Sequence, residues 1–472
     1  MSLKVSFINL ITIALFIIQP LPMKSLSAES GQSLHAPQAK SAPDWLTKGV
    51  MYQIFLRSFI SEGTLQAAAE RLPNVAELGA NIIYLCPVYL QDDDMRKEFW
   101  SPRQKASGAN NPRNPYRIKD YYSIDPEYGT KEDLREFIDT AHELGIRVLM
   151  DLVYLHCGPT SVLVKKHPEY LKRDANGNIV KGNWNFPALN FRNQELREYL
   201  WSNMEYWVQD FDVDGFRCDV SSGIPLEFWE GARTRLDEIR PGLVMLAEGE
   251  RRKDQIKAFD ISYSFTWLNA IHDVFLRGEP ASLLRKTWET MSNERPRGAR
   301  FIRYTENHDI VNNRLRAEVV CSERGAAAVS IINFTLDGVP MLYNGQEIGD
   351  TSPQSIFTSW PMRWNPFVLP KAKARFKFYQ KLCQLRQDET AINAGKVIWL
   401  ENDHPDSTIS FLRRAGADEI LTIASLTNRR SNVQIECTGQ FHPLLADKAK
   451  LNTASDQIAL DLGPFGYYVG KR

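Results

Sequence analysis

The sequence predicts an α/β fold class, in which a closed barrel of parallel strands and helices is followed by a small antiparallel β domain. Short apolar runs alternate with amphipathic helical segments from about residue 50 to residue 343, a pattern typical of a parallel sheet covered by helices. The runs number eight, which is the number of strands in a (β/α)8 or TIM barrel. Beyond about Ile392 polar turns, not helices, separate the runs, which indicates an antiparallel sheet.

The first 28 residues have the pattern of a secretory signal peptide. Lys4 precedes an apolar run from Phe7 to Ile18, and this run is shorter than the roughly 20 residues that a membrane-spanning helix needs. We expect cleavage after Ala28 and a secreted or periplasmic protein, with an uncleaved membrane anchor as the alternative. Cleavage leaves no stable association with the membrane. The polar stretch 29–43 then reads as a linker.

Residues 44–390 are predicted to form the barrel. Lys131–Leu144 and Asn193–Val208 carry apolar side chains at helical spacing between two strands. The intervals after the second and third strands are long, and residues from about 157 to 190 are predicted to form a short inserted subdomain after the third strand. The predicted strands are Val50–Phe55, Asn81–Cys86, Arg147–Val153, Val213–Arg217, Leu243–Ala247, Ala258–Tyr263, Phe301–Tyr304 and Val339–Tyr343.

Residues 391–472 are predicted to form a β-sandwich domain. The segment lacks an internal repeat and consists of strand-like runs joined by polar turns. Its predicted strands are Ile409–Arg413, Ile420–Leu426, Val433–Glu436, Gln457–Leu462 and Tyr467–Val469.

The charge balance argues against a nucleic-acid partner. The chain has 57 Lys and Arg residues and 57 Asp and Glu residues, whereas a nucleic-acid footprint needs a basic stripe. A hydrophobic fraction of 43% and a charged fraction of 24% are typical of globular proteins and exclude a disordered or collagen-like chain. Neither the composition nor the pattern indicates an oligomeric state.

The six cysteines are widely separated and form neither a metal-type pair nor a dense disulfide framework. Cys86, Cys157 and Cys218 each adjoin a predicted strand, so we expect buried free thiols there.

Chemically active side chains follow the predicted strands. In a barrel of this kind the active site forms at the carboxyl ends of the strands, so these side chains are expected to converge on one mouth. Carboxylates follow the fourth, fifth and seventh strands. The candidate positions are Asp151 and His156; Arg217 and Asp219; Glu248; Glu306, His308 and Asp309; and Tyr116, Asp120 and Tyr121.

Two facing carboxylates fit retaining glycoside hydrolysis, in which one acts as the nucleophile and the other donates a proton. Arg217 and Asp219 lie two residues apart and share a face of their strand, so the guanidinium is expected to keep Asp219 ionised. Glu248 is expected to stay protonated because of burial and the nearby negative charge. His308 and Asp309 could hold sugar hydroxyls and stabilise positive charge at the anomeric carbon.

Seven segments, in order, resemble the α-amylase family of glycoside hydrolases, glycoside hydrolase family 13. Each block alone is a weak signal, but together they extend from about Trp45 to Trp364. The blocks are YQIFLRSF at 52–59, GANIIYLCPV at 79–88, DYYSIDPEYGT at 120–130, GIRVLMDLVYLH at 145–156, DVDGFRCDV at 212–220, TENHDI at 305–310 and GVPMLYNGQEIG at 338–349.

The resemblance implies roles for three carboxylates. Asp219 matches the nucleophile of the family, Glu248 the general acid/base and Asp309 the carboxylate that stabilises the transition state. Glu250 is a rival acid by its position, although the end of the strand favours Glu248.

Five further positions match substrate-binding residues of the family. The resemblance assigns substrate contacts to His156, Arg217 and His308. Tyr116 resembles the aromatic ring that stacks under the sugar, and Asp151 resembles the carboxylate that orients the arginine.

The sequence departs from the family pattern where calcium would bind. Leu155 replaces the asparagine that many members carry before the histidine, and Ile60–Leu72 lacks the alternating Asp and Asn residues of a calcium loop. A calcium ion is possible but not indicated, and no metal ligands or other cofactors are assigned. The acidic run at 91–94 is interpreted as a solvated loop, with a metal site as the alternative. Trp184 and Phe186 are candidate sugar platforms.

These observations predict a secreted retaining glycoside hydrolase that cleaves α-1,4-glucosidic bonds in starch or malto-oligosaccharides, with an α-glucan or oligosaccharide as its partner. The alternative within the family is a transglycosylase or an α-glucosidase that acts on trehalose, sucrose or cyclodextrins. A non-catalytic glucan-binding protein is the alternative from a different class.

Overall fold

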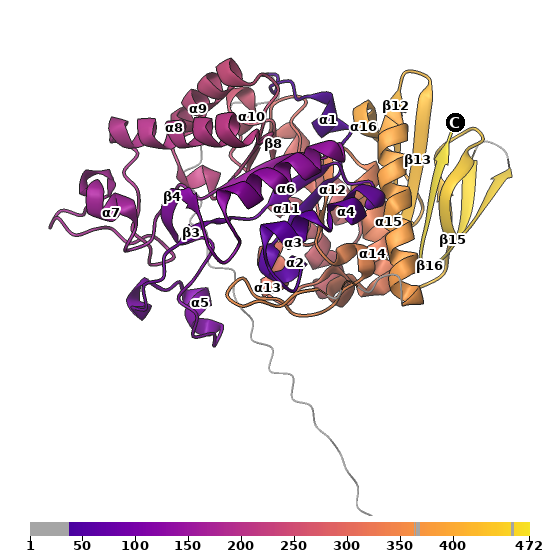
Figure 1. Ribbon diagram of the computed structural model, residues 1–472. Coiled ribbons are helices and arrows are strands. Elements are labelled where there is room, and N and C mark those ends of the chain that lie inside the picture. The colour runs from indigo at the N-terminus through magenta and orange to yellow at the C-terminus, as the bar shows by residue number, and fades with distance from the viewer. Residues whose placement is uncertain (1–36, 363, 365–368, 455–456) are drawn as a thin grey trace, which may run out of the picture. The chain divides into compact units, whose positions relative to one another are not determined.

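A computed structural model of the chain describes residues 37–362, 364, 369–454 and 457–472 (Figure 1). The predicted signal peptide and residues 29–36 of the predicted linker lie outside the described residues. Residues 37–43 lie against the barrel: Arg297 N–H donates to the carbonyl of Pro37 at 2.9 Å, and Lys40 N–H donates to that of Gln255 at 2.8 Å. Within the part of the chain that the structure describes, no helix is both long and apolar enough to cross a membrane.

The barrel forms from parallel strands at the predicted positions. The strands β1 and β2 are buried along their whole length, because the core fills the barrel on the inside and helices cover it on the outside. The sheet order is β8-β7-β6-β5-β2-β1-β10-β9. The barrel strands are β1 (Met51–Ile54), β2 (Ile82–Leu85), β5 (Arg147–Leu152), β6 (Gly215–Cys218), β7 (Val244–Ala247), β8 (Ile261–Ser262), β9 (Ile302–Arg303) and β10 (Val339–Tyr343).

The barrel closes between its two shortest strands, β8 and β9. One parallel bridge joins Ser262 to Phe301. Beside it the buried Gln255 side chain pairs with the backbone of Arg300, donating to the carbonyl at 2.7 Å and accepting from the N–H at 2.7 Å. The same amide donates to Ser262 Oγ at 3.1 Å. A side chain therefore supplies at this seam the hydrogen bonds that a longer strand would make.

Helices cover the outside of the barrel, as predicted. Helix α6 begins with a capping box between Thr130 and Asp133 and buries Leu134, Phe137 and Ile138. The helices are α1 (Asp44–Thr47), α2 (Leu56–Phe59), α3 (Leu65–Ala69), α4 (Leu72–Leu78), α6 (Lys131–Glu143), α8 (Gln194–Phe211), α9 (Leu226–Ile239), α10 (Asp254–Lys257), α11 (Phe265–His272), α12 (Ser282–Asn293), α13 (His308–Asn312), α14 (Ala317–Thr335), α15 (Pro370–Asp388) and α16 (Thr390–Ala394).

Two long insertions follow β2 and β5. The first contains the antiparallel pair β3 (Tyr89–Gln91) and β4 (Ile118–Ile124), with the short helix α5 (Pro102–Ala106) between them. The second contains α7 (Val162–Lys166) and isolated bridges such as His156 to Ala188. Figure 1 shows α5, α7, β3 and β4 on one side of the barrel.

The C-terminal strands form an antiparallel sheet that contacts α14 and α16. Its order is β11-β12-β13-β16-β14, and β15 pairs with β16. The strand β16 pairs with β14 through residues 458–462 and with β13 through residues 467–471. The bounds are β11 (Lys396–Trp399), β12 (Thr408–Ala415), β13 (Asp418–Ser425), β14 (Ser431–Ile435), β15 (His442–Ala454) and β16 (Gln457–Lys471). The division at residue 391 and the two-layered sandwich stay predictions.

All six cysteines are buried free thiols, which confirms the expectation for Cys86, Cys157 and Cys218. Burial raises the pKa of Cys157 to about 12, so this thiol is not poised to react.

Candidate active site

The sequence-predicted residues surround one small cavity at the carboxyl ends of the barrel strands. Its volume is about 130 Å³, and the segments after β6, β7 and β9 bring in Asp219, Glu248 and Asp309, the last of which lies in α13. Asp151 and Arg217 are buried beside it. The lining consists of Ser101, Arg103, Asn114, Tyr116, His156, Trp184, Phe186, Asp219, Val220, Glu248, His308, Asp309, Ile356 and Phe357.

Arg217 is fully buried and contacts three carboxylates. Its Nη1 lies 2.6 Å from Asp151 Oδ1 and 2.9 Å from Asp219 Oδ1. Its Nη2 lies 2.6 Å from Glu248 Oε1. Because Asp219 and Glu248 bind neighbouring nitrogens of one planar group, their carboxyls lie side by side. This is compatible with the separation of about 5–5.5 Å typical of retaining glycosidases.

The expectation that Arg217 keeps Asp219 ionised is wrong for this arrangement. Burial and the charge of Glu248 raise the pKa of Asp219 well above its usual range, and Arg217 only partly opposes them. Burial also raises the pKa of Glu248, against the effect of Arg217. One guanidinium cannot neutralise three buried carboxylates, so we infer that Asp219 and Glu248 share a proton.

The structure separates Glu248 from its rival Glu250. Glu248 Oε2 accepts a hydrogen bond from Val220 N–H at 2.7 Å inside the cavity. Val220 has a φ of 42°, a left-handed conformation that a β-branched residue rarely adopts. Glu250 does not line the cavity and accepts instead from Thr266 N–H at 3.1 Å and Thr266 Oγ1 at 2.6 Å.

A chain of polar contacts fixes Tyr116 and His308. Gln53 Nε2 lies 2.7 Å from His308 Nδ1, and His308 Nε2 lies 2.8 Å from Tyr116 Oη. Tyr116 donates in turn to Asp151 Oδ2 at 3.0 Å. Burial lowers the pKa of His308 to about 4, so its ring is neutral at pH 7. Because Nδ1 accepts a hydrogen bond from Gln53, the proton of the neutral ring is on Nε2, which faces Tyr116 Oη.

His156 lies among aromatic side chains. Its ring centroid is 4.9 Å from that of Phe186 and 5.5 Å from that of Trp184. Its Nε2 lies 2.9 Å from the Tyr116 carbonyl, and burial lowers its pKa to about 4. Tyr121 Oη donates a hydrogen bond to the His156 carbonyl at 2.7 Å.

Asp309 has a partner that the sequence reasoning missed. Arg103, on α5, forms an ion pair with Asp309 Oδ1. Burial would raise the pKa of Asp309, but the neighbouring His308, whose Nε2 lies 3.5 Å from Asp309 Oδ2, and the charge of Arg103 outweigh it and lower this pKa well below its usual range. The Ser101-Pro102 pair is a helix-start signal in the sequence, but nothing local in the sequence shows that this helix reaches Asp309.

Two other candidate positions serve the fold. Glu306 is buried in an ion pair with Arg316 at 2.7 Å and accepts from Ala317 N–H at 2.6 Å. Asp120 accepts from Ser123 Oγ at 2.8 Å within β4. Neither residue lines the cavity.

The interpretation of residues 91–94 as a solvated loop is wrong for its first half. Gln91 and Asp92 are buried, whereas Asp93 is exposed and pairs with Lys119 at 2.8 Å. Among the described residues no group of three or more His, Cys, Asp or Glu side chains is arranged to hold a metal ion. Leu155 packs against the apolar core. The calcium content stays a prediction.

Comparison with known proteins identifies the family. The alpha-amylase catalytic domain matches residues 32–177 and 179–372. A cyclomaltodextrinase from a Bacillus species is 25% identical over 85% of this chain and 76% of its own length.

Two solved structures are similar over most of their length. A noncanonic maltogenic alpha-amylase from Thermotoga neapolitana is 29% identical over 90% of this chain and 97% of its own, with a TM-score of 0.75. An alpha-amylase from Lactobacillus plantarum is 25% identical over 90% and 99%, with a TM-score of 0.77. The chain therefore belongs to the α-amylase family, glycoside hydrolase family 13, and is a glycoside hydrolase.

Proposed function

We propose that the protein hydrolyses α-1,4-glucosidic bonds in malto-oligosaccharides or starch with retention of configuration. The observation that carries this proposal is the pair of carboxyls, Asp219 and Glu248, held side by side on Arg217 at the cavity. A retaining glycosidase needs two such groups and one proton between them, and the raised pKa of both carboxyls favours a bound proton.

The proton balance gives each group a role. Asp219 attacks the anomeric carbon as a carboxylate, while Glu248 gives its proton to the glycosidic oxygen and the bond to the leaving sugar breaks. Glu248, now ionised, then takes a proton from water, and the resulting hydroxide attacks the anomeric carbon and releases Asp219. Asp309 holds hydroxyls of the sugar beside His308 while positive charge builds at the sugar ring.

Cyclodextrin hydrolysis is the second candidate, because the Bacillus relative is named a cyclomaltodextrinase. Transfer to a sugar acceptor and attack on trehalose or sucrose use the same two carboxyls. The non-catalytic binding alternative is weakened because Asp219, Glu248 and Asp309 all line the cavity.

A proton NMR time course with maltoheptaose, run beside one with β-cyclodextrin, tests the proposal. We expect shorter products that first appear as the α-anomer and mutarotate afterwards. Products that first appear as the β-anomer would contradict retention. Unchanged spectra with both substrates would contradict hydrolysis of α-1,4-glucans.

We also propose that the protein is secreted or periplasmic, supported by the signal-like composition of residues 1–28. Protein purified from the medium or periplasm of the source cells is expected to begin at Glu29. A chain that starts at Met1 and fractionates with the cytosol would contradict this location.

A further inference from the structure

The strand order defines which wall of the cavity faces away from Glu248. Glu248 follows β7, and β1 is the strand on the opposite side of the closed barrel. The neighbours of β1 are β2 and β10. In the proposed reaction the leaving sugar must lie beside the acid Glu248. Any glucose unit on the non-reducing side of the cleaved bond must therefore extend toward the loops that follow β2 and β10.

Those two loops are joined across β1. Asn111, in the loop after β2, donates from Nδ2 to the carbonyl of Phe357, in the loop after β10, at 2.9 Å. Arg57 Nη1 donates to the carbonyl of Ile356 at 2.8 Å, and Ile356 N–H donates to Asn312 Oδ1 at 3.1 Å. Both Ile356 and Phe357 are buried and line the cavity. The cavity thus has a fixed wall on the side away from Glu248.

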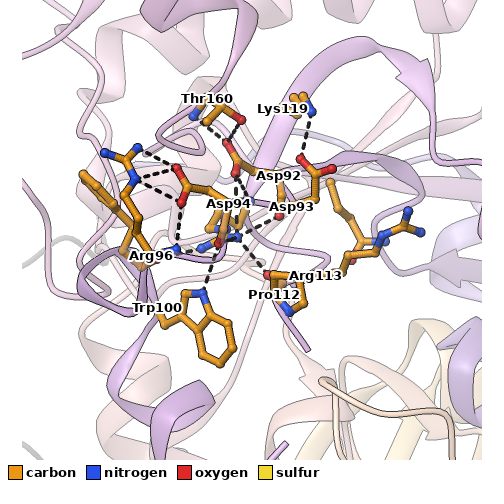
Figure 2. A network of polar contacts seen from close by, with 12 residues as sticks. Asp92, Asp93, Asp94, Arg96, Trp100, Pro112, Arg113, Lys119 and Thr160 are labelled. Carbon is orange, nitrogen blue, oxygen red and sulfur yellow. Dashed lines mark hydrogen bonds and ion pairs between the residues drawn. The ribbon is translucent and has the colours of Figure 1, made fainter. Parts of the chain in front are cut away.

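The loop that carries α5 is held by a buried polar network (Figure 2). Arg117 is fully buried, and its Nη2 donates to the carbonyls of Asp92, Asp94 and Pro112 at 2.8–2.9 Å. Asp92 accepts from the N–H and hydroxyl of Thr160 at 2.6 and 2.8 Å. These bonds tie the loop that carries α5 both to itself and to the second insertion.

Arg103 is the residue of this loop that contacts Asp309. Its side chain is 41% exposed at the rim, and one nitrogen binds Asp309. A guanidinium has five N–H donors, and the structure shows no other hydrogen bond from Arg103 to the residues it describes. The remaining donors are available to sugar hydroxyls.

We propose that Arg103 and the wall of α5, Ile356 and Phe357 restrict the enzyme to the glucosyl unit at the non-reducing end of its substrate. The inference rests on the proposed α-1,4-glucan hydrolysis and specifies its direction. The cavity is small, at about 130 Å³, and Ile356 and Phe357 line it on the side away from Glu248, so we place a single sugar ring there. Arg103 is a specificity-determining residue that binds the hydroxyls of this terminal ring, and the product is glucose.

The test uses maltoheptaose labelled at its reducing end, with its non-reducing end either free or blocked by a 4,6-benzylidene group. The wild-type enzyme is expected to prefer the free chain by at least about 10-fold in kcat/KM, because the blocked ring cannot fit and loses its hydroxyl contacts. Its first labelled product is expected to be the chain shortened by one glucose.

Arg103→Ala is expected to lose most of this preference and to form shorter labelled products early. Arg103→Lys keeps the charge but loses the planar fork, and we expect it to show an intermediate preference. Arg113→Ala is the matched control: Arg113 is in the same loop and is also 41% exposed, but it pairs with Asp125 at 3.4 Å. This variant is expected to keep the wild-type preference.

The outcomes separate the inference from the proposed function. If wild type cleaves free and blocked chains equally well, the inference is overturned while the proposed function stands. If Arg103→Ala keeps the full preference and an unchanged Tm, the assignment to Arg103 is overturned. If wild type cleaves neither chain, the proposed function itself fails.

Discussion

Replacing Asp219 by asparagine is expected to reduce turnover of maltoheptaose by at least about 10⁴-fold, because an amide cannot form the glycosyl ester. The measurement is kcat/KM for glucose release, with Asp120→Asn as the control, since Asp120 lies in β4 away from the cavity. If the asparagine variant kept wild-type turnover, another residue would have to be the nucleophile.

The same substitution is expected to make the protein more stable at neutral pH. Folding raises the pKa of Asp219 well above its usual value, mainly because of burial and the charge of Glu248. A folded pKa above the unfolded one means that this group costs stability as the pH rises above about 4. The asparagine variant should therefore gain more in Tm at pH 8 than at pH 5. An equal gain at both pH values would argue against a raised pKa.

Replacing Glu248 by glutamine is expected to have an effect that depends on the leaving group. Maltoheptaose needs a proton on the departing oxygen, so its kcat/KM should fall by about 10³-fold, within the range of general acid catalysis. The aryl group of an activated aryl glucoside leaves without needing a proton. The rate at which this substrate forms the glycosyl-enzyme should therefore fall far less. The burst of aryl alcohol in stopped-flow measurements reports that step.

Glu250→Gln is the matched control for this prediction. Glu250 binds Thr266 outside the cavity, so its substitution should leave both substrates near wild-type rates. Equal losses on both substrates in Glu248→Gln, or a leaving-group dependence that appears instead in Glu250→Gln, would assign the acid role to another group.

The sequence was sufficient to predict the barrel because its strands are short, largely apolar runs that are followed by polar side chains. It was less informative for the C-terminal sheet. Two predicted strands, Gln457–Leu462 and Tyr467–Val469, are parts of the single strand β16. Gly463 and Pro464 resemble a turn, but the partner β15 shifts register between Asp447 and Ala449 and so accommodates them. The strands β11 and β15 were not predicted; polar residues interrupt the apolar pattern of β15, and β11 has only four residues.

For the active site, residue types at strand ends predicted which side chains meet, but not how charge is shared among them. Asp219 lies near Arg217 in sequence, whereas the contact of Arg217 with Glu248 depends on the spacing of β6 and β7. Arg103 lies outside every recognised segment. Its place beside Asp309 depends on a loop fixed by Arg117 and Asp92, whose contacts span distant parts of the chain.

The junction between β8 and β9, where Gln255 pairs with Arg300, lies between the strands that carry the three carboxylates. Asp219 and Glu248 follow β6 and β7 on one side of it, and Asp309 follows β9 on the other. By the shorter way around the barrel, the two sides are joined by one backbone bridge, by the amide of Gln255, by Ser264 Oγ, which donates to the carbonyl of Ile302, and by the ring contact of Tyr263 with Tyr304. The alignment of Asp309 with the other two carboxylates therefore depends in part on side-chain hydrogen bonds at this junction, whereas backbone pairing joins the other neighbouring strands of the barrel.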